Sequence, residues 1–145
     1  MAEQTSGSIE IDAPPEQVME VISDYESYPE WAGVKTAEVL QRDSKARPAE
    51  VAMSVSQMGF EASYTLAYEY ASDFGGVSWT TKEASGAVKD IGGEYVLEAS
   101  EGGTKVTYYL TLELGISLPG FLKRQADKQV INLALGGLKK RVEEG

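Results

Sequence analysis

The sequence contains no cysteine and no histidine, and these two absences exclude most of the common catalytic and metal-binding chemistry. Without cysteine there are no disulfides, thiol nucleophiles or thiolate metal ligands. Without histidine there is no serine–histidine–aspartate triad, no imidazole acid or base, and no typical zinc site. Any catalysis would depend on Asp, Glu, Lys, Tyr, Arg or ordered water. We therefore expect no metal and no cofactor, and we assign no catalytic residue.

Basic side chains are also scarce, since 13 Lys and Arg stand against 23 Asp and Glu and give a net charge of −10. Residues 1–118 carry 7 basic and 20 acidic residues (net −13), whereas residues 119–145 carry 6 and 3 (net +3). A body this acidic repels phosphate backbones, so we expect no nucleic-acid partner. The basic segment is either a solvated helix face, which we favour, or a contact for an anionic membrane surface or an acidic protein.

Long apolar runs are missing as well. No stretch approaches the roughly 18 apolar residues of a membrane span. Residues 1–12 lack the basic start and apolar core of a secretory signal. We expect a cytoplasmic protein without stable membrane insertion, although peripheral membrane contact stays open. The length of 145 residues predicts a single domain, residues 1–145, as a monomer or weak homodimer.

The hydrophobic pattern predicts an α+β fold. A short strand over 8–12 precedes a helix that starts at Pro14-Pro15, with Asp12 or Ala13 as its cap, and ends near Asp24. A very short helix follows, with Ser27 as its expected cap and Gly33 at its end. Period-two alternation then predicts strands over 34–41, 50–58, 60–70, 77–81, 86–99 and 104–114, with a bulge at Gly92-Gly93. A long final helix over 119–143 should cover one face of this antiparallel sheet. Its expected buried stripe is Leu122, Ala126, Val130, Leu133, Ala134, Leu138 and Val142.

Three segments carry a family resemblance: IEIDAPPEQVMEVISDYESYPEW (9–31), GGTKVTYYLTLEL (102–114) and LPGFLKRQADKQV (118–130). Together they resemble the START/Bet v1-like (SRPBCC) superfamily, and within it the bacterial polyketide cyclase/dehydrase-like proteins. The resemblance implies a helix-grip fold, in which a curved antiparallel sheet of about seven strands wraps a long C-terminal helix, with two short helices after the first strand. It also implies an elongated apolar cavity. Members of the superfamily bind lipids, sterols, polyketides, quinones or hormones, and a minority catalyse cyclisation or dehydration.

Tyrosines on the expected covered faces favour a cavity over a dry core. A buried hydroxyl without a partner costs about 1–3 kcal/mol, so several of them facing one helix fit a chamber that holds water or a ligand with polar groups. Trp31 is either a packing staple, which we favour, or a cavity wall, and Gly137 either permits close packing or leaves room for a ligand. The predicted ligand contacts are Trp31, Met53, Val55, Tyr64, Leu66, Tyr68, Trp79, Tyr95, Leu97, Tyr108, Leu110, Val130, Leu133, Ala134 and Gly137.

The function favoured by these features is binding or transport of a small hydrophobic ligand: a lipid, a polyketide-like molecule or an isoprenoid. One alternative is a polyketide aromatase/cyclase or dehydratase that uses cavity tyrosines, which would require a buried Arg, Asp or Glu in contact with a Tyr. Another is a partner-binding or quinone-chaperone-like module. The cavity mouth is expected at the loops around Met58-Gly59, Phe74-Gly75 and 116–120. Leu118, Pro119 and Phe121 are its candidate lid.

Overall fold

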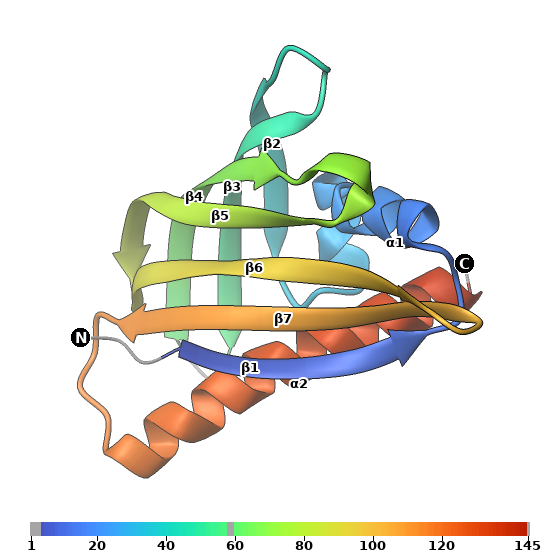
Figure 1. Ribbon diagram of the computed structural model, residues 1–145. Helices are drawn as coiled ribbons and strands as arrows, with labels where there is room; N and C mark the ends of the chain where they lie inside the picture. Colours follow the sequence, from blue (N-terminus) through green and yellow to red (C-terminus); the bar gives the residue numbers. More distant parts are fainter. Residues whose placement is uncertain (1–3, 58–59, 145) are drawn as a thin grey trace.

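A curved antiparallel sheet and one long helix make up most of the protein (Figure 1). The structure, a computed structural model, describes residues 4–57 and 60–144. The seven strands lie in the order β1-β7-β6-β5-β4-β3-β2, with antiparallel neighbours throughout. This arrangement confirms the predicted α+β helix-grip fold. The strands are β1 (Gln4–Ile11), β2 (Thr36–Arg42), β3 (Pro48–Gln57), β4 (Phe60–Tyr70), β5 (Gly76–Gly86), β6 (Val88–Ser100) and β7 (Gly103–Leu114).

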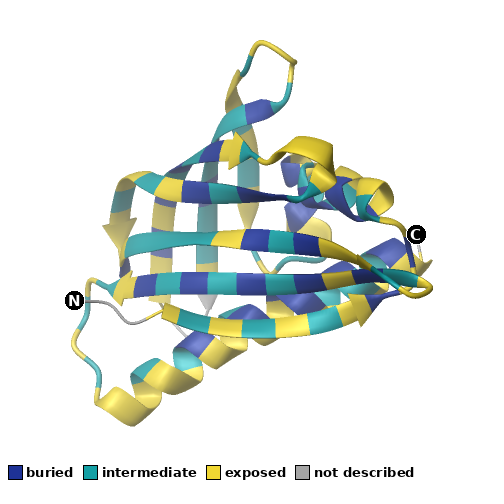
Figure 2. Ribbon diagram, in the orientation of Figure 1, coloured by how far each residue is buried: buried dark blue, intermediate teal, exposed yellow. Residues whose placement is uncertain are grey.

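Period-two alternation sets the two faces of the sheet, as the bands of buried and exposed residues along the strands show (Figure 2). On β4 the buried residues are Ala62, Tyr64, Leu66 and Tyr68, and the residues between them are exposed or half-buried. Successive side chains of a strand point to opposite faces, so the apolar set turns toward the concave side. The sheet therefore presents one continuous apolar surface to the helix.

Two short helices close one end of the sheet. Helix α1 (Pro15–Ile22) starts at a proline and buries Val18, Met19 and Ile22. The 3-10 helix η1 (Tyr25–Glu30) follows it directly and buries Tyr25 and Tyr28. It begins earlier than the expected helix between Ser27 and Gly33. The Ser27 hydroxyl donates to Asp24 Oδ2 at 2.7 Å, so it does not cap a new helix.

The final helix, α2 (Gly120–Glu144), packs mainly on β1, and also on α1 and β7. A Cβ on Gly7 of β1 would lie only 2.7 Å from Ile131 Cγ2, so the missing side chain lets the helix approach this strand. Ala134, Leu138 and Val142 are buried as predicted, and Ile131, Leu135 and Asp127 join them. The buried stripe is thus rotated from the predicted one.

Asp127 is the one charged side chain that is buried among the described residues, at 4% exposure. Its carboxylate accepts hydrogen bonds from the Thr5 hydroxyl (3.1 Å) and from the Lys123 ammonium (2.7 Å). A buried charge needs such partners to offset its lost hydration. The pairing ties the N-terminal half of α2 to the start of β1.

Candidate functional site

A cavity of about 690 Å³ lies between the concave face of the sheet and α2. Its walls come from β3 to β7, from one side of α2 and from the segments around η1. The lining is predominantly apolar, with Ile22 and Tyr28 at the end closed by the short helices. Sites for small molecules usually occupy about 300–1,000 Å³ and have this mixture of apolar walls and few polar groups.

Most of the residues predicted to contact a ligand line this cavity. They come from five strands, β3 to β7, and from α2, so the fold brings together residues that are far apart in the sequence. They are Met53, Val55, Tyr64, Leu66, Tyr68, Trp79, Tyr95, Tyr108, Val130, Leu133 and Ala134.

Four predicted contacts lie elsewhere. Leu97 and Leu110 belong to the buried core but do not border the cavity. Trp31 and Gly137 meet each other, since a Cβ on Gly137 would lie 2.5 Å from the Trp31 carbonyl oxygen and 3.1 Å from its indole ring. Gly137 therefore permits close packing of α2 against Trp31.

The prediction missed several cavity residues that come from the short helices and from the strand ends. Tyr25 and Tyr28 line the closed end, and the helical spacing of Tyr28 and Trp31 offered a signal for them. For the missed residues on β6 and β7, the signal was their place in the alternation of inward-facing and outward-facing residues along these strands. The other missed lining residues of these elements are Ile22, Val88, Ile91, Leu112 and Leu114.

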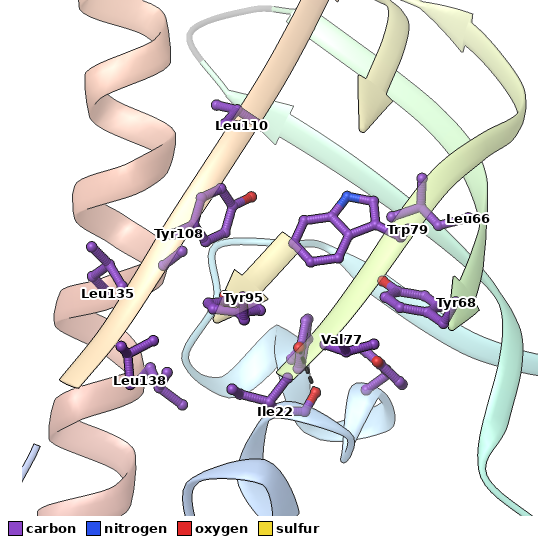
Figure 3. Packing of buried hydrophobic residues seen from close by; sticks show 14 of the residues in the cluster. Ile22, Leu66, Tyr68, Val77, Trp79, Tyr95, Tyr108, Leu110, Leu135 and Leu138 are labelled. Carbon is purple, nitrogen blue, oxygen red and sulfur yellow. Dashed lines mark hydrogen bonds between the residues drawn. The ribbon is translucent and has the colours of Figure 1, made fainter. Parts of the chain in front are cut away.

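An aromatic cluster forms one wall of the cavity, and Figure 3 shows its labelled rings grouped together beside the strands. The Trp79 ring centroid lies 5.8 Å from that of Tyr68, 5.5 Å from Tyr95 and 5.6 Å from Tyr108. The rings of Tyr95 and Tyr108 meet edge to face at 4.8 Å. Such tilted pairs suit the charge distribution of aromatic rings and hold one another in place.

Gly93 makes room for this cluster. A Cβ on Gly93 would lie 3.0 Å from Trp79 Cζ2 and 2.2 Å from the Tyr109 carbonyl oxygen. The predicted bulge at Gly92-Gly93 is wrong, because both glycines pair in register with Thr111 and Leu110 of β7. The register shift lies between Val88 and Asp90 instead. Gly93 allows the close approach of the indole ring to the sheet.

The tyrosine hydroxyls fall into two groups. At the closed end, Tyr28 donates to the Ile22 carbonyl at 2.5 Å, and Tyr70 donates to the Pro48 carbonyl at 2.6 Å. The Tyr70 hydroxyl also lies 3.2 Å from that of Tyr25. Within residues 4–57 and 60–144 no such bond is found for the hydroxyls of the other four tyrosines that line the cavity. In that same part of the chain, the one enclosed side-chain polar atom without a partner is Trp31 Nε1. The cavity hydroxyls are therefore open to the cavity space; they belong to Tyr64, Tyr68, Tyr95 and Tyr108.

Burial keeps these phenols protonated at neutral pH. Loss of hydration raises the pKa of Tyr64 to about 12. It also raises the pKa values of Tyr95, Tyr68 and Tyr108 above that of a free phenol, and neighbouring tyrosines add to the effect for the last two. The phenols can thus donate a hydrogen bond to a ligand oxygen, and they are not phenolate bases at neutral pH.

Charged groups stand at the rim of the cavity. Glu61 and Lys128 border it, and both are exposed. The buried polar side chains among the described residues are Thr104 and Asp127, and neither lines the cavity. The contact of a buried Arg, Asp or Glu with a cavity tyrosine, which the cyclase alternative requires, is therefore not found in this part of the chain.

The mouth of the cavity lies at the start of α2. Ile116, Leu118 and Leu122 border it from the loop and first turn, and Phe60 borders it from β4. Phe74 does not border it, because its short 3-10 helix η2 (Ser72–Phe74) contacts α1 at the other end of the molecule. The Met58-Gly59 loop, also predicted at the mouth, lies outside the described residues.

The described part of the chain also lacks the features of a metal site and of a membrane span. No three acidic side chains gather there in a way that could hold a metal ion. No described helix combines the length and apolar character needed to cross a bilayer.

Known proteins share this sequence pattern and fold. The model of the polyketide cyclase/dehydrase and lipid transport family matches residues 2–143. The chain belongs to this family. Its membership confirms the predicted superfamily, whereas no curated protein matches the chain significantly.

Solved structures of other proteins superpose over nearly the whole of this family member. A START superfamily protein from Mycobacterium smegmatis has a TM-score of 0.87 at 20% identity, covering 97% of each chain. The Zhui aromatase/cyclase from a Streptomyces species has a TM-score of 0.73 at 16% identity, covering 98% of this chain and 96% of its own. A STAR-related lipid transfer protein from Xanthomonas axonopodis has a TM-score of 0.72 at 20% identity, covering 97% and 85%. At these identities the likeness shows the fold alone.

Proposed function

We propose that this family member binds a small hydrophobic ligand, such as a lipid, a polyketide-like molecule or an isoprenoid, in the cavity between the sheet and α2. It would do so in the cytoplasm, as a single domain of residues 1–145. The observation that carries the proposal is the largely apolar cavity of about 690 Å³, together with phenol hydroxyls that bond to no described residue. The names of two structural neighbours, a lipid transfer protein and an aromatase/cyclase, are in keeping with it.

The apolar wall would supply most of the affinity, because burying apolar surface contributes about 25 cal/mol per Å². Tyr64 and Tyr108 would donate hydrogen bonds to oxygen atoms of the ligand. Without a ligand, these hydroxyls can form hydrogen bonds only to water. A ligand with carbonyl or hydroxyl groups can replace that water, so such a ligand is favoured over a plain hydrocarbon. Trp31 and Gly137 would act indirectly, by holding the helix in place.

The first test is native mass spectrometry of protein purified from its own host, followed by organic extraction and identification of any bound molecule. We expect a stoichiometric hydrophobic compound. An unliganded mass, together with no thermal shift across a panel of lipids, quinones and polyketide-like compounds, would contradict the proposal.

A variant pair locates the binding site. Ala62→Phe fills the cavity, because Ala62 is buried on the inner face of β4 and lines it. Ala67→Phe adds the same volume on the opposite face of the same strand. With 1-anilinonaphthalene-8-sulfonate as the probe, Ala62→Phe should weaken binding about tenfold while Ala67→Phe retains it. Equal binding by the two variants would place the probe outside the cavity.

A second candidate function is aromatase/cyclase or dehydratase chemistry on a poly-keto substrate. The protonated cavity phenols favour it, since a phenol placed near a carbonyl oxygen can donate a proton as that oxygen gains charge. The test is incubation with a poly-keto thioester and analysis of products by mass spectrometry. Loss of water that depends on the Tyr108 hydroxyl, and is lost in Tyr108→Phe, would support catalysis; a rate equal to that without protein would contradict it.

A further inference from the structure

Apolar side chains surround the mouth of the cavity, and the described residues leave them exposed. Phe121 is 61% exposed, Phe60 49%, Leu133 43% and Leu122 37%. The last three border the cavity, and Phe121 is next to Leu122 in the first turn of α2. In Figures 1 and 2 this end of α2 projects past the sheet and is mostly exposed. We call these four residues, together with Arg124 and Lys128, the mouth patch.

The charge of the mouth patch is opposite to that of the rest of the surface. Residues 119–145 have a net charge of +3, whereas residues 1–118 have −13. Arg124 and Lys128 are exposed and form no ion pair with any described residue, while Lys123 is held by Asp127. The patch therefore combines exposed aromatic and aliphatic groups with two cationic groups on the same turns of one helix.

We propose that the mouth patch docks the protein on an anionic lipid bilayer. Apolar side chains flanked by basic groups on one helix are typical of segments that lie in the membrane interface. Phe121 and Leu122 enter the acyl boundary, and Arg124 and Lys128 meet the anionic headgroups. Because charges are screened beyond about 8 Å at physiological ionic strength, the distant acidic surface does not cancel this local attraction.

Of two possible partners for the mouth patch, an anionic bilayer and a second copy of the chain, the charge of the patch favours the bilayer. A symmetric dimer formed through the patch would place Arg124 and Lys128 of each copy against those of the other, because the same surface meets itself. Like charges facing each other oppose association. An anionic bilayer offers negative charge and an apolar layer together. The cavity opens through the same patch, so a docked protein would face the layer in which hydrophobic molecules dissolve.

The test is co-sedimentation with extruded vesicles of phosphatidylglycerol and phosphatidylcholine in equal amounts, and with phosphatidylcholine alone. We expect binding to the anionic vesicles only, and loss of this binding in 1 M salt, where screening shortens to about 3 Å. The double variant Phe121→Ser/Arg124→Glu should lower vesicle affinity at least about tenfold. Neither of these two side chains lines the cavity.

The matched control is Leu40→Ser/Lys140→Glu, which removes a comparably exposed apolar side chain and makes the same change in net charge away from the patch. It should bind anionic vesicles like the wild type, and circular dichroism on heating should show that both variants are folded. No binding by the wild type, or equal loss in the two variants, would overturn the proposal. So would a dimer in light scattering that disappears in Phe121→Ser/Arg124→Glu while vesicle binding is absent. The proposal does not depend on the cavity ligand, because the assay contains none.

Discussion

The two halves of α2 differ in what they contact. In the C-terminal half, Leu135, Leu138 and Val142 are buried, and Gly137 lies against Trp31. In the N-terminal half, Leu122 and Val130 border the cavity; Leu122 is exposed and Val130 is half-buried. One element thus carries both the packing that stabilises the fold and the space that can admit a ligand. The difference teaches that the C-terminal turns mainly stabilise the fold, whereas the N-terminal turns also line the space that can admit a ligand.

The largest expected effect compares two leucines of this helix. Leu138→Ala should lower the free energy of unfolding by about 2–5 kcal/mol, because Leu138 is fully buried and its removal leaves a cavity. Leu122→Ala should change it by less than about 1 kcal/mol, because that side chain already meets the cavity and solvent. Urea unfolding followed by circular dichroism measures both. Similar losses in the two variants would mean that the N-terminal half is also packed.

The second prediction concerns the adjacent glycines, for which we expect effects of opposite sign. Gly137→Ala should destabilise the protein by about 1–3 kcal/mol, because the new Cβ would press on the Trp31 backbone. Gly136→Ala should stabilise it by about 0.5–1 kcal/mol, since nothing lies within 4 Å of its Cβ position and alanine favours the helix. Thermal unfolding of the pair measures the difference. A shared sign would contradict the contact with Trp31.

The smallest effect separates the two kinds of buried tyrosine. Tyr28→Phe should cost about 1–2 kcal/mol, because it leaves the Ile22 carbonyl without its donor. Tyr108→Phe should lie within about 0.5 kcal/mol of the wild type in the absence of ligand, because its hydroxyl bonds to no described residue. Guanidinium unfolding of the two variants gives the comparison. A large loss in Tyr108→Phe would show that its hydroxyl is bonded within the protein.

The strands and their faces could be predicted from the sequence because burial on one face leaves a period of two. The expected strand 60–70 coincides with β4, Phe60–Tyr70, and its inward tyrosines line the cavity. Local pattern is sufficient here, since a shift by one residue would expose the whole apolar set. The expected helix 119–143 likewise matches α2, Gly120–Glu144.

The rotation of α2 could not be predicted, because the helix is apolar on two sides. One side, with Leu122, Val130 and Leu133, borders the cavity, and another, with Ile131 and Leu135, packs on the sheet. A spacing of three and four residues fits either side. The choice depends on contacts between distant segments.

Two such contacts fix this rotation. One is the approach of Ile131 to Gly7, and the other is the bond between Thr5 and Asp127. Both join β1 to residues more than a hundred positions later, so no local pattern reveals them. The same applies to Trp31 and Gly137, whose contact is visible only once the helix is placed.

The pairing of β1 with β7 has a consequence for how the chain reaches its fold. Gln4 lies opposite Thr111 and Ile11 opposite Thr104, so the first strand pairs only with the last. During synthesis β1 is made before β7, so its apolar residues stay unpaired until the chain has been extended through residue 114. Contacts so distant in sequence are slow to form, because a long loop must close before they contribute. The pairing of β1 with β7 completes the sheet and forms the surface on which α2 packs. This step should therefore occur late in folding.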